Sequence, residues 1–222
     1  AYCSLPTINY MEPTHHISNK QLTLKELDHI LHGHSKITLS EDARVKIIRC
    51  RDYLDEKLAT STHPIYGINT GFGSLYNKHI PKDQLEQLQE NLVMSHACGT
   101  GPEVSREIVL LMLFLKVQSL SYGYSGVQVE TVERLIDMFN QRVLPRVYEM
   151  GSLGASGDLA PLAHLCLPLI GKGKIGNKPS LEVLTNHNFN PLTLGPKEGL
   201  ALINGTQFMT AYGIYSLLLA KK

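Results

Sequence analysis

Residues 155–157, Ala-Ser-Gly, carry the groups that a rare backbone reaction needs. The amide nitrogen of Gly157 can reach the carbonyl carbon of Ala155, because glycine has no Cβ to obstruct the approach. Ring closure with loss of water, together with loss of the Ser156 hydroxyl as water, would leave a five-membered ring with an exocyclic methylene group. Such a ring is an electrophile, which no ordinary side chain provides. The tripeptide is common in proteins, so the surrounding sequence has to decide whether it reacts.

The same residues also suit a simple turn before a helix. Asp158 is a good helix N-cap, and Pro161 suits the first turn of a helix. The two interpretations are compatible, since a helix N-terminus stabilises negative charge that develops nearby. Glycines at 151, 154 and 157 also suggest a phosphate-binding loop, but no Gly-Lys-Ser/Thr sequence and no preceding strand accompany them.

Four segments of the chain follow one another in an informative order. They are residues 66–73 (YGINTGFG), 91–97 (NLVMSHA), 151–164 (GSLGASGDLAPLAH) and 198–207 (EGLALINGTQ). Together they resemble the aromatic amino acid ammonia-lyases, most closely the histidine-specific members, from about residue 22 to the last residue. Four independent segments make this resemblance far more specific than one short motif. It implies that Ala155, Ser156 and Gly157 become a methylidene-imidazolone group, formed autocatalytically and without an external cofactor.

Removal of ammonia from an α-amino acid explains why such a group is needed. The amine is a poor leaving group and the β-hydrogen is weakly acidic. An electrophile that takes up the amine turns it into a better leaving group, which is covalent catalysis with the usual polarity reversed. A general base must then remove the β-proton, and the resemblance assigns this role to Tyr66. A free phenol has a pKa of about 10, so the role requires a site that lowers the pKa of Tyr66.

The segment around Tyr66 is rich in glycine. Gly67, Gly71 and Gly73 would let the backbone pass close to a ligand or act as a lid. The alternative is a tyrosine that packs its ring within this loop.

The resemblance makes Ser95 and His96 the residues that select the aromatic ring of the substrate. Ser-His is similar to the histidine-specific pair, whereas tyrosine- and phenylalanine-specific members carry His-Leu and Phe-Leu. His96 would exchange a hydrogen bond with an imidazole ring, and a leucine would suit an apolar ring better. The alternative is a histidine whose hydrogen bonds are satisfied at the end of a helix.

Asn204 is similar to the family's asparagine near the prosthetic group, where it would hydrogen-bond the substrate or the ring. An asparagine followed by Gly205 suits a helix cap equally well. Gln207 lies one helical turn further on, and we expect it on the same side as a supporting substrate contact.

The function that the resemblance implies is a carbon–nitrogen lyase that converts L-histidine into urocanate and ammonia. A phenylalanine or tyrosine ammonia-lyase, or an aminomutase with the same group, is the nearest enzymatic alternative. A catalytically inactive fragment that acts only in assembly or binding is the alternative of another class. Family members form homotetramers whose sites combine several subunits, so a homotetramer is expected of the full-length protein.

Charge and composition exclude several other classes. The chain has 21 basic and 20 acidic residues, a net charge of +1 and no basic stripe, so no nucleic-acid partner is expected. The apolar run over residues 108–115 is too short to span a bilayer. The four cysteines form no Cys-x-x-Cys pair and the first twenty residues resemble no signal peptide, which favours reduced thiols and the cytoplasm. The histidines at 29, 32 and 34 lack the spacing of a metal site, so no metal is expected.

Helical patterns dominate the chain, which predicts a mainly α fold. Helix starts are indicated at Thr23, whose capping box includes Glu26, at Ser40 and within residues 100–103. The helix after residue 103 is apolar almost all round, which is typical of a helix buried on every side. Residues 62–80 and 171–196 are expected to be loops with short strands. The second helix is expected to bury one apolar face, formed by Val45, Ile48, Leu54 and Leu58.

We expect three parts along the chain. Residues 1–20 are an irregular leader, residues 21–196 a mixed N-terminal domain with the Ala-Ser-Gly loop and the first bundle helices, and residues 197–222 the truncated start of a central helical bundle. The last part is predicted as one helix that begins near Pro196, with no capping glycine before the chain stops. The chain is therefore expected to be a fragment, inactive alone and prone to association because residues 108–115 lack bundle partners.

Overall fold

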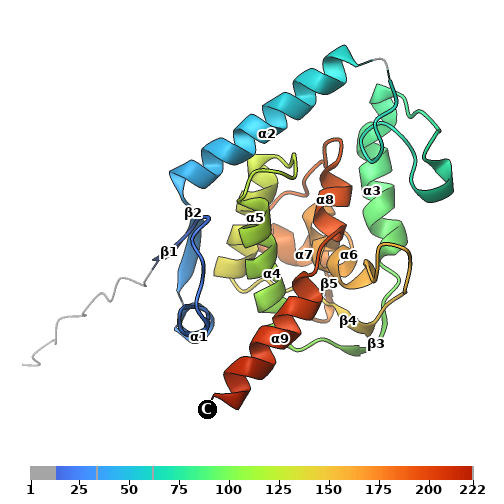
Figure 1. The fold of residues 1–222 in the computed structure, drawn as a ribbon. Coiled ribbons are helices and arrows are strands. Elements are labelled where there is room, and N and C mark those ends of the chain that lie inside the picture. The colour runs from blue at the N-terminus through green and yellow to red at the C-terminus, as the bar shows by residue number, and fades with distance from the viewer. Residues whose placement is uncertain (1–13, 34, 62, 222) are drawn as a thin grey trace, which may run out of the picture.

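Helices make up most of the structure, as Figure 1 shows, which confirms the mainly α fold. The computed structural model describes residues 14–33, 35–61 and 63–221. Its helices are α1 (Leu24–His32), α2 (Glu41–Thr60), α3 (Leu85–His96), α4 (Arg106–Leu120), α5 (Val129–Asn140), α6 (Ala160–Cys166), α7 (Ser180–Asn186), α8 (Glu198–Ile203) and α9 (Gln207–Ala220). Short 3-10 helices cover Gly73–Leu75, Lys82–Gln84 and Leu167–Ile170.

In the described part of the chain, short strands form three pairs. β1 (Thr14–Ile17) runs parallel to β2 (Lys36–Leu39), β3 (Thr100–Glu103) is antiparallel to β4 (Tyr148–Met150), and β5 (Lys174–Ile175) is antiparallel to β6 (Lys178–Pro179). The first two pairs join segments that are distant in the sequence. They hold the N-terminal strand and the segment after α3 in place.

Strands β1 and β3 correct two sequence predictions. β1 lies within the expected irregular leader, whose residues 1–13 are outside the described residues. Residues 100–103 form a strand paired with β4 instead of starting a helix. α4 begins only at Arg106, because the Ser105 hydroxyl accepts a hydrogen bond from the Ile108 amide at 3.5 Å and caps the helix there.

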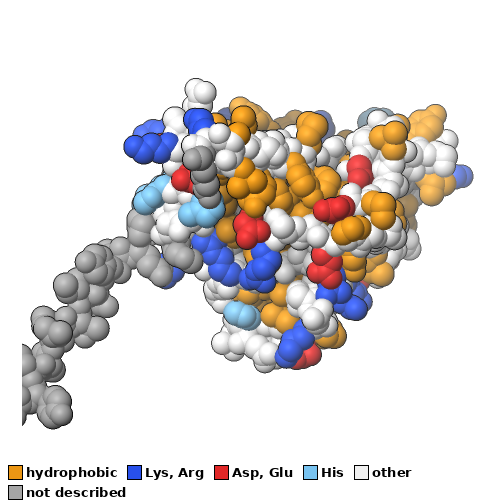
Figure 2. Space-filling view, turned by 90° about the horizontal axis from the view of Figure 1, so that it is seen from below, with side chains coloured by type: hydrophobic (Ala, Val, Ile, Leu, Met, Phe, Trp, Pro, Cys, Tyr) orange, Lys and Arg blue, Asp and Glu red, His pale blue; other side chains and the backbone are white. Residues whose placement is uncertain are grey.

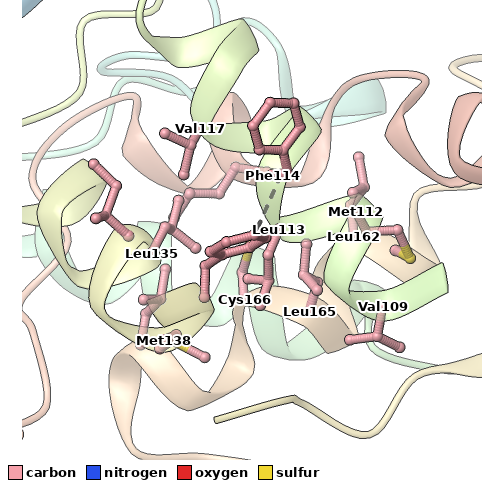
Figure 3. Close-up of a cluster of buried hydrophobic side chains, with 14 of the residues drawn as sticks. Val109, Met112, Leu113, Phe114, Val117, Leu135, Met138, Leu162, Leu165 and Cys166 are labelled. Atoms are coloured by element: carbon pink, nitrogen blue, oxygen red, sulfur yellow. Dashed lines mark hydrogen bonds between the residues drawn. The ribbon is translucent and has the colours of Figure 1, made fainter. Parts of the chain in front are cut away.

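α4 lies at the centre of the hydrophobic core. It packs against α5 and α9, and most of its side chains are buried, as the sequence predicted. Figure 3 shows side chains from α4, α5 and α6 meeting in one cluster, among them Leu113, Leu135, Met138 and Leu165. Full burial of such a side chain stabilises the fold by about 1.5–3 kcal/mol.

The first two helix starts form as predicted, because their caps are local. The Thr23 Oγ1 accepts from the Glu26 amide at 3.2 Å, and the Glu26 Oε2 accepts from the Thr23 amide at 2.7 Å. The Ser40 hydroxyl caps α2 by accepting from the Ala43 amide at 3.2 Å. These reciprocal bonds satisfy donors that a helix start otherwise leaves unpaired.

The buried face of α2 differs from the predicted one. Ala43, Ile47 and Leu54 are buried, whereas Val45 and Ile48 are 53% and 42% exposed. Of the expected apolar face, therefore, only Leu54 is part of the core, and Val45 and Ile48 face solvent.

The C-terminal region contains three helices where one was predicted. α7 lies within the expected loop of residues 171–196. The predicted single helix after Pro196 is wrong, since α8 ends at Ile203 and α9 begins at Gln207. The break between α8 and α9 contains Asn204, and its cause lies in a tertiary contact with α4 described below.

α9 leaves much of its apolar surface uncovered. It has no charged side chain, and Met209, Leu217 and Leu219 are 70%, 53% and 51% exposed. Figure 2, seen from below, shows hydrophobic side chains over much of that face of the molecule. No helix within the described ranges is both long enough and apolar enough to cross a membrane.

Candidate active site

The Ala-Ser-Gly tripeptide lies in a loop whose two ends are held together by Asp158. Its Oδ1 accepts hydrogen bonds from the backbone amides of Ser152 and Ala160, each at 3.1 Å. Gly151 packs directly on this carboxylate, and a Cβ at that position would lie 2.1 Å from Oδ1. Asp158 therefore clamps the start of the loop to the first residue of α6. It is not the N-cap of the helix, a position that Leu159 occupies.

The tip of this loop is open to solvent. The backbone groups of Gly154 and Gly157 bond reciprocally, with both N···O distances at 3.1 Å. Ala155 and Ser156 between them are exposed. Gly157 has φ of +79°, and a Cβ there would meet nothing within 4 Å. The tip fits a methylidene-imidazolone group, because Asp158 fixes the base of the loop, Ala155 and Ser156 are exposed, and the space beside the Gly157 Cα is open.

Tyr66 lies in a turn that the Asn69 side chain closes. The Asn69 Oδ1 accepts from the Ile65 amide at 2.5 Å, and its Nδ2 donates to the His63 carbonyl at 3.3 Å. The Tyr66 ring meets Phe72 edge-on, with centroids 6.0 Å apart, yet the residue is 58% exposed. The alternative prediction was a tyrosine ring packed within its own loop. The Tyr66 ring does contact Phe72 of that loop, but most of the residue is exposed.

The Tyr66 turn rests against α8 through a glycine. Gly67 has φ of +75°, and a Cβ there would lie 2.6 Å from the Leu200 Cδ2. Any other residue would be strained and would push the turn away from α8. Gly67 thus sets the distance between the Tyr66 turn and the helix that ends at Asn204.

His96 is the last residue of α3, and its ring is oriented by its own helix. The Nδ1 atom lies 2.8 Å from the Leu92 carbonyl oxygen. A carbonyl only accepts, so Nδ1 carries a proton, and in the neutral form of the ring this tautomer leaves Nε2 as an acceptor. The Ser95 hydroxyl donates to the same carbonyl at 3.1 Å and lies 3.3 Å from Nδ1. The alternative of a histidine whose hydrogen bonds are satisfied at the helix end therefore applies to Nδ1 only. It does not account for Nε2.

Asn204 follows the last residue of α8, and a buried lysine hydrogen-bonds the backbone at this point. The Lys116 ammonium on α4 donates to the carbonyls of Ala201 and Asn204 at 3.1 and 3.2 Å. Lys116 is completely buried, and this burial lowers its pKa to about 8. Carbonyls at a helix end have no partner within the helix, so the ammonium stabilises the end of α8 at this point. Sequence reasoning missed Lys116, although a single lysine in an apolar helix was a visible signal.

Gln207 stands apart from the position predicted for it. It begins α9, so it is not one turn beyond Asn204 on the same helix. Its side chain is buried, and its Oε1 makes no hydrogen bond to the described residues. Gly205 leaves the space for this side chain, because a Cβ there would lie 2.2 Å from the Gln207 Oε1.

Glu198 fixes the other end of α8 and was also missed. This fully buried carboxylate accepts from the Gln128 amide at 2.9 Å and from its side chain at 2.6 Å. It also accepts from the Thr131 hydroxyl at 2.7 Å and the Gly195 amide at 2.8 Å. α8 is therefore held at both ends by buried charged side chains.

The helices that carry the candidate residues pack together. α3, α6 and α8 contact one another, and the Gln89 Oε1 of α3 accepts from the Gly199 amide of α8 at 2.9 Å. Within the described part of the chain, no hydrogen bond joins the candidate side chains to one another; these are Tyr66, His96, Ser156 and Asn204. The structure thus places these residues through their backbones and buried neighbours.

Of the three clustered histidines, His29 and His32 are exposed, as the sequence predicted. The His32 Nδ1 lies 2.9 Å from the Asp28 carboxylate, and both side chains are 49% exposed. His34 lies outside the described residues. Among the residues that the structure describes, no group of three or more His, Cys, Asp or Glu side chains could hold a metal ion.

The mainly α fold of this chain is similar to that of solved lyases and aminomutases of aromatic amino acids. The aromatic amino acid lyase family matches residues 22–222 of the sequence. The chain therefore belongs to this family.

The chain is also similar to individual members of the family. The chain is 46% identical over 200 residues to the histidine ammonia-lyase of Symbiobacterium thermophilum, covering 88% of this chain and 39% of that protein. The solved histidine ammonia-lyase from Trypanosoma cruzi superposes with a TM-score of 0.83 at 36% identity, over 92% of this chain and 41% of that one. The tyrosine aminomutase from Streptomyces globisporus gives a TM-score of 0.82 at 32% identity, over 92% and 38%. The chain spans about 40% of the length of the curated relatives it matches.

Proposed function

We propose that this chain supplies the electrophile-forming part of a histidine ammonia-lyase, which eliminates ammonia from L-histidine to give urocanate. The observation that carries the proposal is the open tip at residues 155–157, held at its base by Asp158. Similarity to histidine ammonia-lyases over most of the chain supports the same reaction.

The proposed chemistry divides between the tripeptide and the residues around it. When formed, a methylidene-imidazolone at residues 155–157 supplies the electrophile that takes up the substrate amine. Tyr66 removes the β-proton, for which its phenol must first lose its own proton. Asn204 hydrogen-bonds the substrate or the prosthetic ring, and Lys116 keeps its backbone in place. Gln207 is a supporting contact at the start of α9.

Ring selection follows from the hydrogen-bonding state of His96. Because Nδ1 donates to the Leu92 carbonyl, Nε2 of the neutral ring is the atom that would accept the N–H of an imidazole ring. A phenyl ring has no such donor and would leave Nε2 unpaired, which costs binding energy. The Ser95 hydroxyl donates to the same Leu92 carbonyl as the His96 Nδ1, so the two side chains are held next to each other. This favours histidine over phenylalanine as the substrate.

Properties of the whole protein belong to the same proposal. We expect no external cofactor, a homotetramer whose sites combine several subunits, and a cytoplasmic location. The uncovered apolar surface of α9 supports assembly with further helices.

A substrate panel tests the proposed function. The complete gene product that contains these residues is incubated with L-histidine, L-phenylalanine and L-tyrosine, and absorbance reports urocanate, cinnamate or coumarate. We expect urocanate from histidine and at least about a hundredfold lower rates with the other two, as is usual when a site's polar group goes unpaired.

Two outcomes contradict the proposal. Cinnamate or coumarate as the main product indicates a lyase for another ring. A β-amino acid, detected by chromatography of the same mixtures, indicates an aminomutase.

A further inference from the structure

His164 is a half-buried imidazole on α6 that has no role in the reaction described above. Its Nε2 accepts a hydrogen bond from the backbone amide of Gly99 at 2.9 Å. An imidazole nitrogen accepts only when it is unprotonated, so the ring is neutral with its proton on Nδ1. Burial lowers the pKa of His164, which favours this neutral form.

The His164 ring is enclosed by two other segments. Tyr148 of β4 meets it edge-on, with centroids 5.0 Å apart and planes at 77°. Gly99 lies directly on it, since a Cβ there would be 3.0 Å from the His164 Cδ2 and 3.3 Å from the Tyr148 Cβ. A Cβ at this position would be tighter than an ordinary contact, so the ring or the backbone after α3 would have to shift by a few tenths of an ångström. The ring thus joins α6, β4 and the segment that leaves α3.

This contact belongs to a continuous line of contacts. On one side of Gly99, the Cys98 thiol donates to the Ser152 hydroxyl at 3.7 Å. On the other side, Thr100 pairs with Met150 in the β3–β4 ladder. Residues 98–100 are therefore fixed against the strand that enters the Ala-Ser-Gly loop and against the helix that leaves it.

We propose that His164 is a positioning residue that holds Ser95 and His96 in place relative to residues 155–157. His96 ends α3 just before residues 98–100, and its ring is oriented within α3 by the Leu92 carbonyl. The position of residues 98–100 therefore sets where the end of α3, and with it the His96 ring, lies relative to residues 155–157. The consequence for substrate binding rests on the proposed function, whereas the hydrogen bond to Gly99 does not. Loss of the acceptor leaves a half-buried amide unpaired and frees the segment, which weakens a contact made to the substrate ring.

Substitutions that remove or keep the acceptor test this proposal in the complete gene product. His164→Leu removes the acceptor, while His164→Gln places Oε1 near the position of Nε2. His32→Leu and His32→Gln on exposed α1 are the matched controls. We measure hydrogen exchange of the Gly99 amide, and kcat and KM for L-histidine. A merely structural role lowers the amount of folded enzyme and hence the apparent kcat, but leaves KM unchanged.

We expect His164→Leu to speed Gly99 exchange and raise KM by about tenfold each, the effect of one unpaired buried amide. His164→Gln is expected to restore both to within about threefold, the scatter of a substituted hydrogen bond. An unchanged KM in His164→Leu, or no rescue by His164→Gln, overturns the proposal. If the unsubstituted protein forms no urocanate, the proposed function fails, and Gly99 exchange in the variants still decides whether the contact holds the segment.

Discussion

The central helix and the Ala-Ser-Gly loop are built in opposite ways. α4 is buried on nearly every side, and its stability comes from side chains such as Phe114 that are completely enclosed. The loop exposes Ala155 and Ser156 and is held by polar contacts, namely the Asp158 carboxylate at its base and the backbone bonds between Gly154 and Gly157. The reactive tripeptide is therefore free of packing constraints, while its ends cannot move apart.

This difference teaches where stability and chemistry reside in the molecule. Substitutions in α4 should reduce the free energy of unfolding, and substitutions at the loop tip should remove chemistry while the fold persists. Two side chains connect helices to segments of the candidate site: Lys116 of α4 bonds the end of α8, and His164 of α6 bonds the segment after α3. The predictions below separate these contributions.

The largest effect is expected at the loop tip. Ser156→Ala has no hydroxyl to lose, so the methylene group cannot form, and kcat with L-histidine should fall by about a thousandfold or more. The free energy of unfolding should change by less than about 0.5 kcal/mol, because the side chain is exposed. Urocanate absorbance and urea unfolding measure the two quantities. A parallel loss of activity and stability would contradict the separation of the two regions.

A core substitution should show the reverse pattern. Phe114→Ala opens a cavity in α4 and should reduce the free energy of unfolding by about 3–5 kcal/mol. Leu153→Ala, in the loop and 93% exposed, is the matched control and should change it by less than about 0.5 kcal/mol. Urea unfolding compares them directly. Equal effects would mean that the loop contributes to the core after all.

A smaller effect is expected where the substrate ring is selected. His96→Leu removes the Nε2 acceptor and should raise KM for L-histidine by about tenfold, the effect of one lost hydrogen bond. Steady-state kinetics on the complete gene product provide the value. Ser95→Ala, which keeps the imidazole, should have the weaker effect. An unchanged KM in His96→Leu would remove His96 from substrate recognition.

The smallest effect is a pH dependence set by Lys116. Its pKa is about 8 in the folded chain against 10.5 for the ordinary side chain, so the unfolded state binds more protons between these values. Stability should therefore rise with pH, by about 1 kcal/mol between pH 8 and 9. The buried Cys166 thiol, whose pKa burial raises from 9.0 to about 12, acts in the opposite direction from about pH 8 upward, because the unfolded thiol starts to lose its proton there. It therefore offsets part of the rise.

Lys116→Met should abolish this rise, and Lys172→Met, at an exposed side chain, should preserve it. Urea unfolding at pH 8 and pH 9 measures the difference. A rise that persists in Lys116→Met would assign it to another group.

Sequence reasoning succeeded where the determining contacts are local. The capping box of Thr23 and Glu26 lies within one turn, and the Ser40 cap needs only the helix it starts. The burial of α4 followed from a run of apolar residues long enough to leave no polar face. These features need no knowledge of the rest of the fold.

It failed where a distant segment decides the outcome. Residues 100–103 form a strand because β4, far along the chain, pairs with them. The helix after Pro196 breaks where Lys116 of α4 takes the carbonyls of Ala201 and Asn204. For the candidate site, the tripeptide and His96 were evident from residue types, but the contact between His164 and Gly99 joins residues that are distant in the sequence. The Asp158 clamp is local, yet its form as a loop closure differs from the helix N-cap that the sequence suggested.

The intact mass of the complete gene product tests the central claim most directly. Formation of the prosthetic group removes two waters, so the account predicts a mass about 36 Da below that of the sequence, confined to the peptide with residues 155–157. Ser156→Ala should not show this full loss. A mass equal to that of the sequence in protein that forms urocanate would contradict the account.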